Sequence, residues 1–288
     1  MIVIRPSVPG EEARQRELWK ICFHDEDEYI SLYYGSCYRP EEVLVLLEDD
    51  VIRSMVICLP VSVLTPDGKR HRAAYFYALA TDPISRGKGY AKQLLAFAYD
   101  HLASLGHELG LTVPAMPSLF AFFQSAGLSP RFYFDEKRFT ADGAPGEALV
   151  RPVGHEEYAS FRDGFLAGSF SVLYPEDQIL WQKRASKLAD SDLYAIESSD
   201  FRAFAAAELG EDGLPLLKEF LCPPAFQKAA AAALLKSLKK RSLLARLPIL
   251  GAELPPDAHR FGSIRWYDSA LEQAYGGLPF GYLGLAFD

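Results

Sequence analysis

The chain has 288 residues, of which 49% are hydrophobic and 24% charged, which is the composition of a globular protein. Its length exceeds the roughly 100 to 200 residues of a usual single domain, so two compact units are expected. The 30 basic and 38 acidic residues give a formal net charge of −8, which argues against a surface built to coat nucleic acid.

The cysteines and the apolar runs indicate the compartment. The four cysteines are scattered without the CxxC spacing of a zinc site, which is typical of reduced thiols and of a protein that holds no metal. The apolar start at residues 1–6 is too short for a signal peptide, and no apolar run approaches the roughly 20 residues that span a bilayer. We therefore expect a cytoplasmic protein with no membrane and no nucleic-acid partner.

Hydrophobic periodicity predicts alternating helices and strands in the first half. A strand at residues 1–6 precedes two helices, and the second helix begins in an acidic cluster that complements the helix dipole. An aromatic strand at 73–81 ends at Asp82-Pro83, and apolar residues recur at helical spacing from 90 to 105. The other expected elements are helices at 11–22, 25–37 and 117–125 and strands at 43–48, 51–58, 61–65, 108–113 and 131–139.

The second half echoes this order of elements. Residues 140–146 are small and turn-prone, so we expect them to link the halves. The expected elements beyond them are helices at 156–166, 175–188 and 225–240 and strands at 193–197, 202–209, 214–221, 243–250, 261–267 and 281–287. We therefore predict an α/β (α+β) fold of two units, 1–142 and 147–288, each with a mixed, mostly antiparallel central sheet flanked by helices.

The segment 82–91, with the sequence DPISRGKGYA, lies between the aromatic strand and the start of a helix. A helix N-terminus offers unpaired N–H donors and a partial positive charge, and therefore binds phosphate. Gly87 and Gly89 let the backbone approach a ligand closely, while Arg86 and Lys88 add positive charge. The loop lacks the GKS or GKT ending of a nucleoside-triphosphate loop and the GxGxxG dinucleotide motif. It predicts a diphosphate site of another kind.

Residues 86–91 resemble the Arg/Gln-x-x-Gly-x-Gly/Ala signature of the GNAT acetyltransferases. The preceding segment 79–83 is similar to that family's splayed strand and turn, and FFQSAGL at 122–128 is similar to its short helix ending in Gly-Phe. The resemblance implies two GNAT-like units, with acetyl-CoA as the cosubstrate in the first. It also implies that the cofactor is bound by two groups of residues. The pantetheine arm would pair with Leu79, Ala80 and Thr81. The pyrophosphate would bind to the loop, at Arg86, Gly87, Lys88, Gly89, Tyr90 and Ala91.

The expected proton-transfer residues of the family are absent. Its general-base glutamate aligns with Tyr77, and its general-acid tyrosine aligns with Phe123. An amine still reacts if it arrives neutral or loses its proton to water. The substitutes we consider are Tyr133 as acid, against an ordinary core role, and Glu26 as base, against a role as helix-capping charge.

The two-unit plan is similar to the tandem GNAT proteins of the Eis type, without their third domain. In that family the terminal carboxylate acts at the active site, so the resemblance implies Asp288 as a further candidate base. The equivalent loop of the second half, at 221–228, lacks the glycines and the basic pair. We therefore predict a degenerate second unit, residues 147–288, that binds no CoA.

The sequence thus predicts an acetyl-CoA-dependent N-acetyltransferase acting on a primary amine of a small molecule or of a lysine side chain. Two alternatives stay open. A non-catalytic CoA-binding regulatory or scaffold protein would explain the missing glutamate and tyrosine, and a tRNA-dependent aminoacyltransferase would fit the tandem plan. An oligomer is compatible with the sequence.

Overall fold

The structure, a computed structural model, describes residues 1–141, 148–210, 212–249, 253–278 and 280–287. Contacts between Cα atoms divide the chain into two compact units. Unit 1 consists of Met1–Thr65, Lys69–Arg131 and Gly262–Leu278, and unit 2 of Pro66–Gly68, Phe132–Phe261 and Pro279–Asp288. Of the predicted linker at 140–146, residues 142–146 lie outside the described residues.

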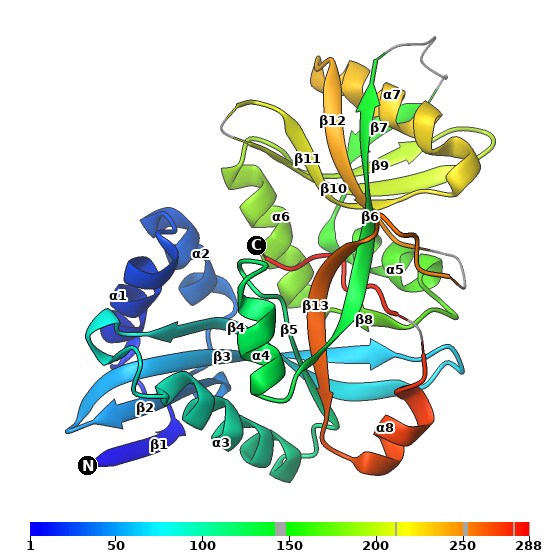
Figure 1. The fold of residues 1–288 in the computed structure, drawn as a ribbon. Coiled ribbons are helices and arrows are strands. Elements are labelled where there is room, and N and C mark those ends of the chain that lie inside the picture. Colours follow the sequence, from blue (N-terminus) through cyan, green and yellow to red (C-terminus); the bar gives the residue numbers. More distant parts are fainter. Residues whose placement is uncertain (142–147, 211, 250–252, 279, 288) are drawn as a thin grey trace. The chain divides into compact units, whose positions relative to one another are not determined.

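Unit 1 is a mixed sheet with helices against both faces (Figure 1). Its strands lie in the order β1-β2-β3-β4-β5-β13, with β4 and β5 parallel and the other neighbours antiparallel. The strands are β1 (Ile2–Pro6), β2 (Val43–Glu48), β3 (Val51–Leu64), β4 (Arg70–Thr81), β5 (Leu109–Thr112) and β13 (His259–Trp266). The helices are α1 (Glu12–Phe23), α2 (Asp27–Ser36), α3 (Tyr90–Ser104), α4 (Leu119–Ser125) and α8 (Ser269–Tyr275), with 3-10 turns η1 (Pro40–Glu42) and η2 (Pro83–Ser85).

Strand β4 shows how the two faces of this sheet are covered, because successive side chains of a strand point to opposite faces. Phe76 packs against Tyr99 of α3, in the buried cluster between α3 and the sheet. Tyr77 packs instead against Trp19 of α1. The sheet therefore separates α3 from α1 and α2.

Strand β3 is longer than the sequence predicted. The two expected strands at 51–58 and 61–65 form one strand that runs through Pro60. Strand β2 pairs with β3 only from Val51 to Ile57, so Pro60 lies beyond that ladder and its missing N–H removes no bond to β2.

Unit 2 is built in the same way. Its strands lie in the order β6-β12-β11-β10-β9-β7, with β11 and β12 parallel and the other neighbours antiparallel. The strands are β6 (Ser129–Thr140), β7 (Leu149–Pro152), β8 (Ser171–Leu173), β9 (Leu193–Glu197), β10 (Arg202–Leu209), β11 (Pro215–Leu221) and β12 (Ser242–Leu247). The helices are α5 (His155–Phe165), α6 (Glu176–Leu188) and α7 (Gln227–Leu238), with the 3-10 turn η3 (Pro224–Phe226). One buried hydrophobic cluster of unit 2 lies between α7 and the sheet.

The two units repeat one topology. In unit 1 the chain runs from β4 through η2 and α3 to the parallel strand β5, and in unit 2 it runs from β11 through η3 and α7 to the parallel strand β12. Before this motif, both units have a strand, two helices and an antiparallel meander, and in unit 2 the additional strand β8 lies between the two helices. The repeat that the sequence suggested is therefore present.

Each sheet is completed by a strand from the other half of the sequence. Strand β13, near the end of the chain, pairs with β5 of unit 1 through Ser263–Trp266. Strand β6, which follows the elements of unit 1, pairs with β12 of unit 2. The compact units are therefore discontinuous and differ from the continuous halves predicted at 1–142 and 147–288, because residues of distant sequence complete each sheet.

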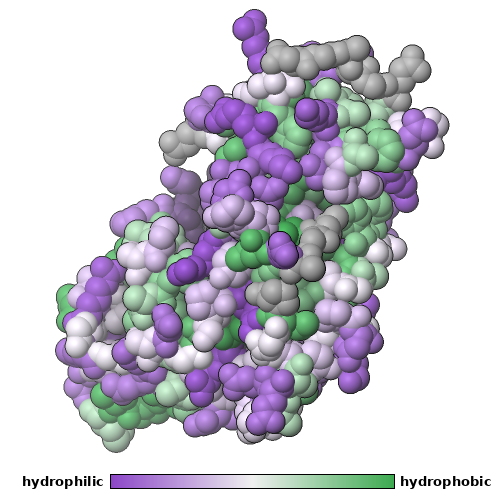
Figure 2. Space-filling view, turned by 45° about the vertical axis from the view of Figure 1, so that its right-hand side comes forward, coloured by the Kyte–Doolittle hydropathy of each residue, from purple (hydrophilic) through white to green (hydrophobic). Residues whose placement is uncertain are grey.

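Two further features bear on the expectations from sequence. The prediction of a strand at 281–287 is wrong. Of these residues, Gly281 and Tyr282 form isolated bridges and the others form no strand pairing. No helix of the described residues combines the length and the apolar character needed to cross a membrane. On the face shown in Figure 2, hydrophilic and hydrophobic residues are interspersed.

Candidate active site

Strands β4 and β5 diverge in the middle of unit 1. They pair only from Ala73 to Phe76 of β4, and the last pair is fixed by Thr112 Oγ1, which donates a hydrogen bond of 2.9 Å to Phe76 O. Two residues later Ala78 has a φ of +47°, and the register with β3 shifts there. Such a bulge bends its strand away from a regular neighbour. Beyond Phe76, β4 therefore has no pairing with β5.

The other edge of β4 remains anchored beyond the bulge. Ala80 pairs with Met55 and Thr81 with Ser54 of β3, and Ser54 Oγ donates a hydrogen bond of 2.7 Å to Ala80 O. The predicted pantetheine-binding segment 79–81 is therefore paired with β3 on one side and is not paired with β5 on the other. A strand-like ligand such as a pantetheine arm can pair with an edge of this kind.

Asp82 fixes the loop that follows β4. It is buried, its carboxylate accepts a hydrogen bond of 3.2 Å from the N–H of Ile84, and it pairs with Arg14 of α1 and with Arg53 of β3. Burial raises the pKa of Asp82, but these hydrogen bonds outweigh it and hold the pKa below its ordinary value of 3.8. The loop therefore begins from a charged anchor that joins three elements.

Two glycines with left-handed backbone shape the turn into α3. Gly87 has a φ of +83° and Gly89 a φ of +79°, which other L-residues adopt only with strain. Among the described residues, a Cβ at Gly87 would meet no atom within 4 Å, and one at Gly89 would meet Gln93 Nε2 at 3.9 Å. The backbone conformation, and not crowding, therefore requires glycine, and the space over the turn is open.

Helix α3 begins immediately after this turn, at Tyr90. The N–H groups of its first turn have no acceptor within the helix, and no side chain caps them. With the helix dipole, they form the arrangement that binds phosphate at helix N-termini. The loop thus offers unpaired donors to a phosphate, and diphosphate binding there stays a prediction.

The basic residues of the loop have protein partners. Lys88 Nζ lies 2.9 Å from a carboxylate oxygen of Glu48, which also accepts a hydrogen bond of 2.5 Å from Tyr90 Oη. These two contacts, that of Tyr90 first, hold the pKa of Glu48 below its ordinary value. Arg86 contacts the sulfur of Cys22 at 3.7 Å. A diphosphate would therefore compete with Glu48 for Lys88.

The predicted acid and base candidates are spread over the chain. Glu26 is the exposed N-cap residue of α2, and its side chain makes no capping hydrogen bond. Tyr133 lies on β6 in unit 2, whereas the loop lies in unit 1, and Tyr133 N–H donates to Gly281 O. Asp288 lies outside the described residues. Phe123, which aligns with the family's general acid, is buried in the core beneath α3.

An aromatic group lies on the α1 and α2 side of β4. Tyr75 is buried, but Tyr77 is partly exposed and its hydroxyl lies 3.1 Å from that of Tyr29 on α2. Trp19 packs edge-on against Tyr77, and its indole N–H donates a hydrogen bond of 2.7 Å to Asp25. The period-two spacing of Tyr75 and Tyr77 is the sequence signal that places both on one face.

Unit 2 lacks an equivalent phosphate turn. Its helix α7 follows η3 through Phe226, which has a φ of −110° where the first unit has the left-handed Gly89. Pro223 and Pro224 precede it and offer no N–H. Among the described residues of this turn, the backbone donors of the first unit are therefore not reproduced.

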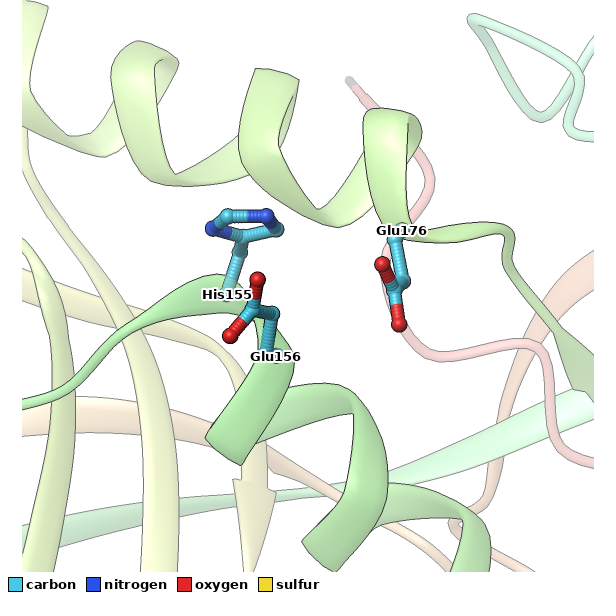
Figure 3. Close-up of side chains that lie close together, drawn as sticks. All are labelled: His155, Glu156 and Glu176. Carbon is cyan, nitrogen blue, oxygen red and sulfur yellow. The ribbon is translucent and has the colours of Figure 1, made fainter.

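A group of side chains in unit 2 has the spacing of metal ligands. His155 and Glu156 begin α5, Glu176 begins α6, and their ligand atoms lie within 4.8 Å of one another (Figure 3). Both carboxylates are exposed, and acidic residues in a first helical turn are favoured by the helix dipole alone. The cluster therefore has a structural explanation, and we assign no metal to it.

Comparisons with known proteins agree with this geometry. Residues 3–127 match the family model described as "Acetyltransferase (GNAT) domain". No curated protein matches the sequence significantly.

Several solved structures share the fold. A GCN5-related N-acetyltransferase from Anabaena variabilis is 13% identical, with a TM-score of 0.72 over 93% of this chain and 74% of that one. A GCN5-related N-acetyltransferase from Kribbella flavida is 15% identical, with a TM-score of 0.70 over 93% and 73%. Eis1 from Mycobacterium abscessus is 13% identical, with a TM-score of 0.71 over 95% and 75%.

The predicted fold class is confirmed by these structures, and the match of the family model includes the splayed strand, the loop and the start of α3. Residues 3–127 are therefore similar to GNAT acetyltransferase domains, the family that the loop sequence resembles.

Proposed function

We propose that this protein transfers an acetyl group from acetyl-CoA to a primary amine, on a small molecule or a lysine side chain. The observation that carries the proposal is the combination, in one unit, of an open edge on β4 with an uncapped α3 N-terminus behind two left-handed glycines. The first feature suits the amide-bearing arm of CoA, and the second suits its diphosphate.

The chemistry follows from this placement. With the diphosphate on the α3 N-terminus and the arm along 79–81, the thioester lies beside the bulge at Ala78. Backbone N–H groups there would stabilise the negative charge that develops on the thioester oxygen as the amine attacks. No carboxylate is contributed by position 77, so the amine must arrive neutral or release its proton to water.

The halves of the chain have different roles in this proposal. Unit 1 holds the cofactor, while unit 2 is a GNAT-like repeat that binds no CoA, because its turn lacks left-handed glycines. The four cysteines are free thiols, which supports a reducing, cytoplasmic compartment.

Isothermal titration calorimetry with acetyl-CoA tests the proposal. We expect saturable binding, and free-thiol release when a panel of primary amines is added. Absence of binding at millimolar acetyl-CoA would refute the cofactor assignment.

The tyrosine and phenylalanine at positions 77 and 123 favour a second candidate, a CoA-binding regulatory protein without turnover. The same two measurements separate it from the enzyme: binding of acetyl-CoA with no thiol release across the amine panel would support the regulator.

A further inference from the structure

Tyr77 occupies a distinctive place in unit 1. It is the first residue of β4 after the pairing with β5 ends, and it immediately precedes the bulge at Ala78. Its side chain is on the α1 and α2 side of the sheet, whereas α3, which follows the diphosphate loop, packs on the other side through Phe76. A cofactor that runs from the α3 N-terminus along the unpaired part of β4 would therefore pass next to Tyr77.

The Tyr77 hydroxyl is held in position by its neighbours. The Tyr77 ring lies 5.4 Å from that of Trp19, at 75°, and Trp19 is almost fully buried. Its hydroxyl oxygen lies 3.1 Å from that of Tyr29, and both tyrosines are partly exposed. A hydroxyl that donates to one partner keeps lone pairs for another donor. The Tyr77 oxygen can therefore accept a hydrogen bond from a ligand while it is bonded to Tyr29.

We propose that the Tyr77 hydroxyl binds the acceptor amine, and that Tyr29 acts through Tyr77 as a positioning residue. This inference rests on the proposed acetyl transfer. The amine donates one N–H to Tyr77 Oη, which turns the nitrogen lone pair toward the thioester carbon beside the bulge. Tyr29 Oη fixes the direction of the remaining Tyr77 lone pairs. The site thus favours an acceptor that has an N–H to donate while its lone pair attacks, as a primary amine does.

The reaction balances without a protein base. The nitrogen lone pair forms the C–N bond, the C–S bond breaks with its electron pair on sulfur, and nitrogen loses a proton to water. Water returns a proton to the thiolate, so the products are the N-acetyl amide and free CoA. Both tyrosine hydroxyls keep their own protons throughout.

Steady-state kinetics of Tyr77→Phe and Tyr29→Phe test the inference, together with acetyl-CoA binding by calorimetry. We expect Tyr77→Phe to lower kcat/KM for the amine about tenfold, the value of one hydrogen bond, and Tyr29→Phe to lower it about threefold. Acetyl-CoA affinity should stay within about twofold of wild type in both variants. Because Tyr29 acts through Tyr77, the double variant should be no worse than Tyr77→Phe alone.

Tyr34→Phe is the matched control. Tyr34 is on the same helix α2 and packs against Trp19, but its hydroxyl donates to Gln15 at 3.2 Å. Removal of this hydroxyl should leave both amine kinetics and acetyl-CoA affinity unchanged. Thermal unfolding of all variants verifies that each is folded.

The outcomes separate the inference from the function on which it rests. Wild-type amine kinetics in folded Tyr77→Phe would overturn the role of Tyr77, and additive losses in the double variant would overturn the role of Tyr29. Failure of the wild-type protein to bind acetyl-CoA would instead overturn the proposed function, and this inference with it.

Discussion

At the scale of single residues, the loop before α3 depends on backbone conformations that only some residues tolerate. Gly87 and Gly89 have left-handed φ values with open space beside them, so their importance lies in the path of the chain and in access for a ligand. Asp82 holds the start of the same loop through two arginines. Both features lead to predictions about binding.

We expect Gly89→Val to abolish measurable acetyl-CoA binding. A β-branched residue at a φ of +79° costs at least about 1 to 2 kcal/mol and redirects the N–H groups that face the ligand. Calorimetry with acetyl-CoA measures the effect. Gly68→Val is the control, because Gly68 has a φ of +82° in the turn between β3 and β4, away from the loop. The Gly68→Val variant should lose stability but keep its affinity for acetyl-CoA. Unchanged acetyl-CoA affinity in Gly89→Val would show that the loop is misassigned.

Asp82→Asn should destabilise the protein at pH 7 by about 1 to 3 kcal/mol, because Arg14 and Arg53 lose their charged partner. The pKa of Asp82 is below 3.8 in the folded protein, so its stabilising effect is complete above pH 3.8 and disappears as the pH falls through the lowered value. The stability difference between wild type and variant should therefore shrink in acid.

Chemical denaturation at several pH values measures this difference. Asp100→Asn, at an exposed position of α3, is the control and should change stability little at any pH. A difference between wild type and Asp82→Asn that stays constant down to pH 2 would contradict the assignment of the loop anchor.

At the scale of elements, unit 2 is organised around a buried ion pair. Arg162 of α5 and Glu219 of β11 lie 3.0 Å apart and are almost inaccessible to solvent. Arg162 also donates to Val172 O and to Leu283 O, so it joins α5 and β11 to β8 and to the segment near the C-terminus. The hydrogen bond from Arg162 to Leu283 O helps to hold the segment 280–287, which has no regular strand structure.

Glu219→Ala should destabilise unit 2 by about 3 to 5 kcal/mol, because it leaves the Arg162 charge buried and unpaired. Glu219→Gln should cost less, since the amide oxygen still accepts from Arg162 and Tyr158. Thermal and denaturant unfolding measure both variants. Glu197→Ala is the control, because Glu197 forms partly exposed ion pairs with Arg151 and Arg202. It should lower the free energy of unfolding by no more than about 1 kcal/mol. Equal losses at Glu219 and Glu197 would contradict this account.

At the scale of the whole molecule, the two repeats exchange strands. Strand β13 completes the sheet of unit 1 beside β5, and β6 completes the sheet of unit 2 beside β12. Each half of the sequence therefore lacks one strand of its own sheet.

A fragment of residues 1–142 should consequently fail to fold cooperatively and should not bind acetyl-CoA. It leaves the β5 edge unpaired and removes Tyr267 from the core beneath α3. Joining residues 259–278 to residue 131 through a flexible linker should restore folding and binding. Circular dichroism melts and calorimetry measure both fragments. A cooperative melt and full-length affinity for the fragment 1–142 would show that β13 is dispensable.

The sequence by itself determined most of the helices and strands in both halves and the glycine turn before α3. These features are encoded locally, in hydrophobic periodicity, in Gly87 and Gly89, and in the residues that begin a helix. The same local information identified the GNAT family and the absence of its glutamate and tyrosine.

Only the tertiary structure decided the pairing of β13 with β5, the bulge at Ala78 and the contact between Tyr29 and Tyr77. A strand pattern states which face is apolar but not which distant edge the strand will pair with, so the exchange of strands between the halves could not be read from it. Tyr29 and Tyr77 are 48 positions apart in the sequence and meet only after the sheet and its helices have packed.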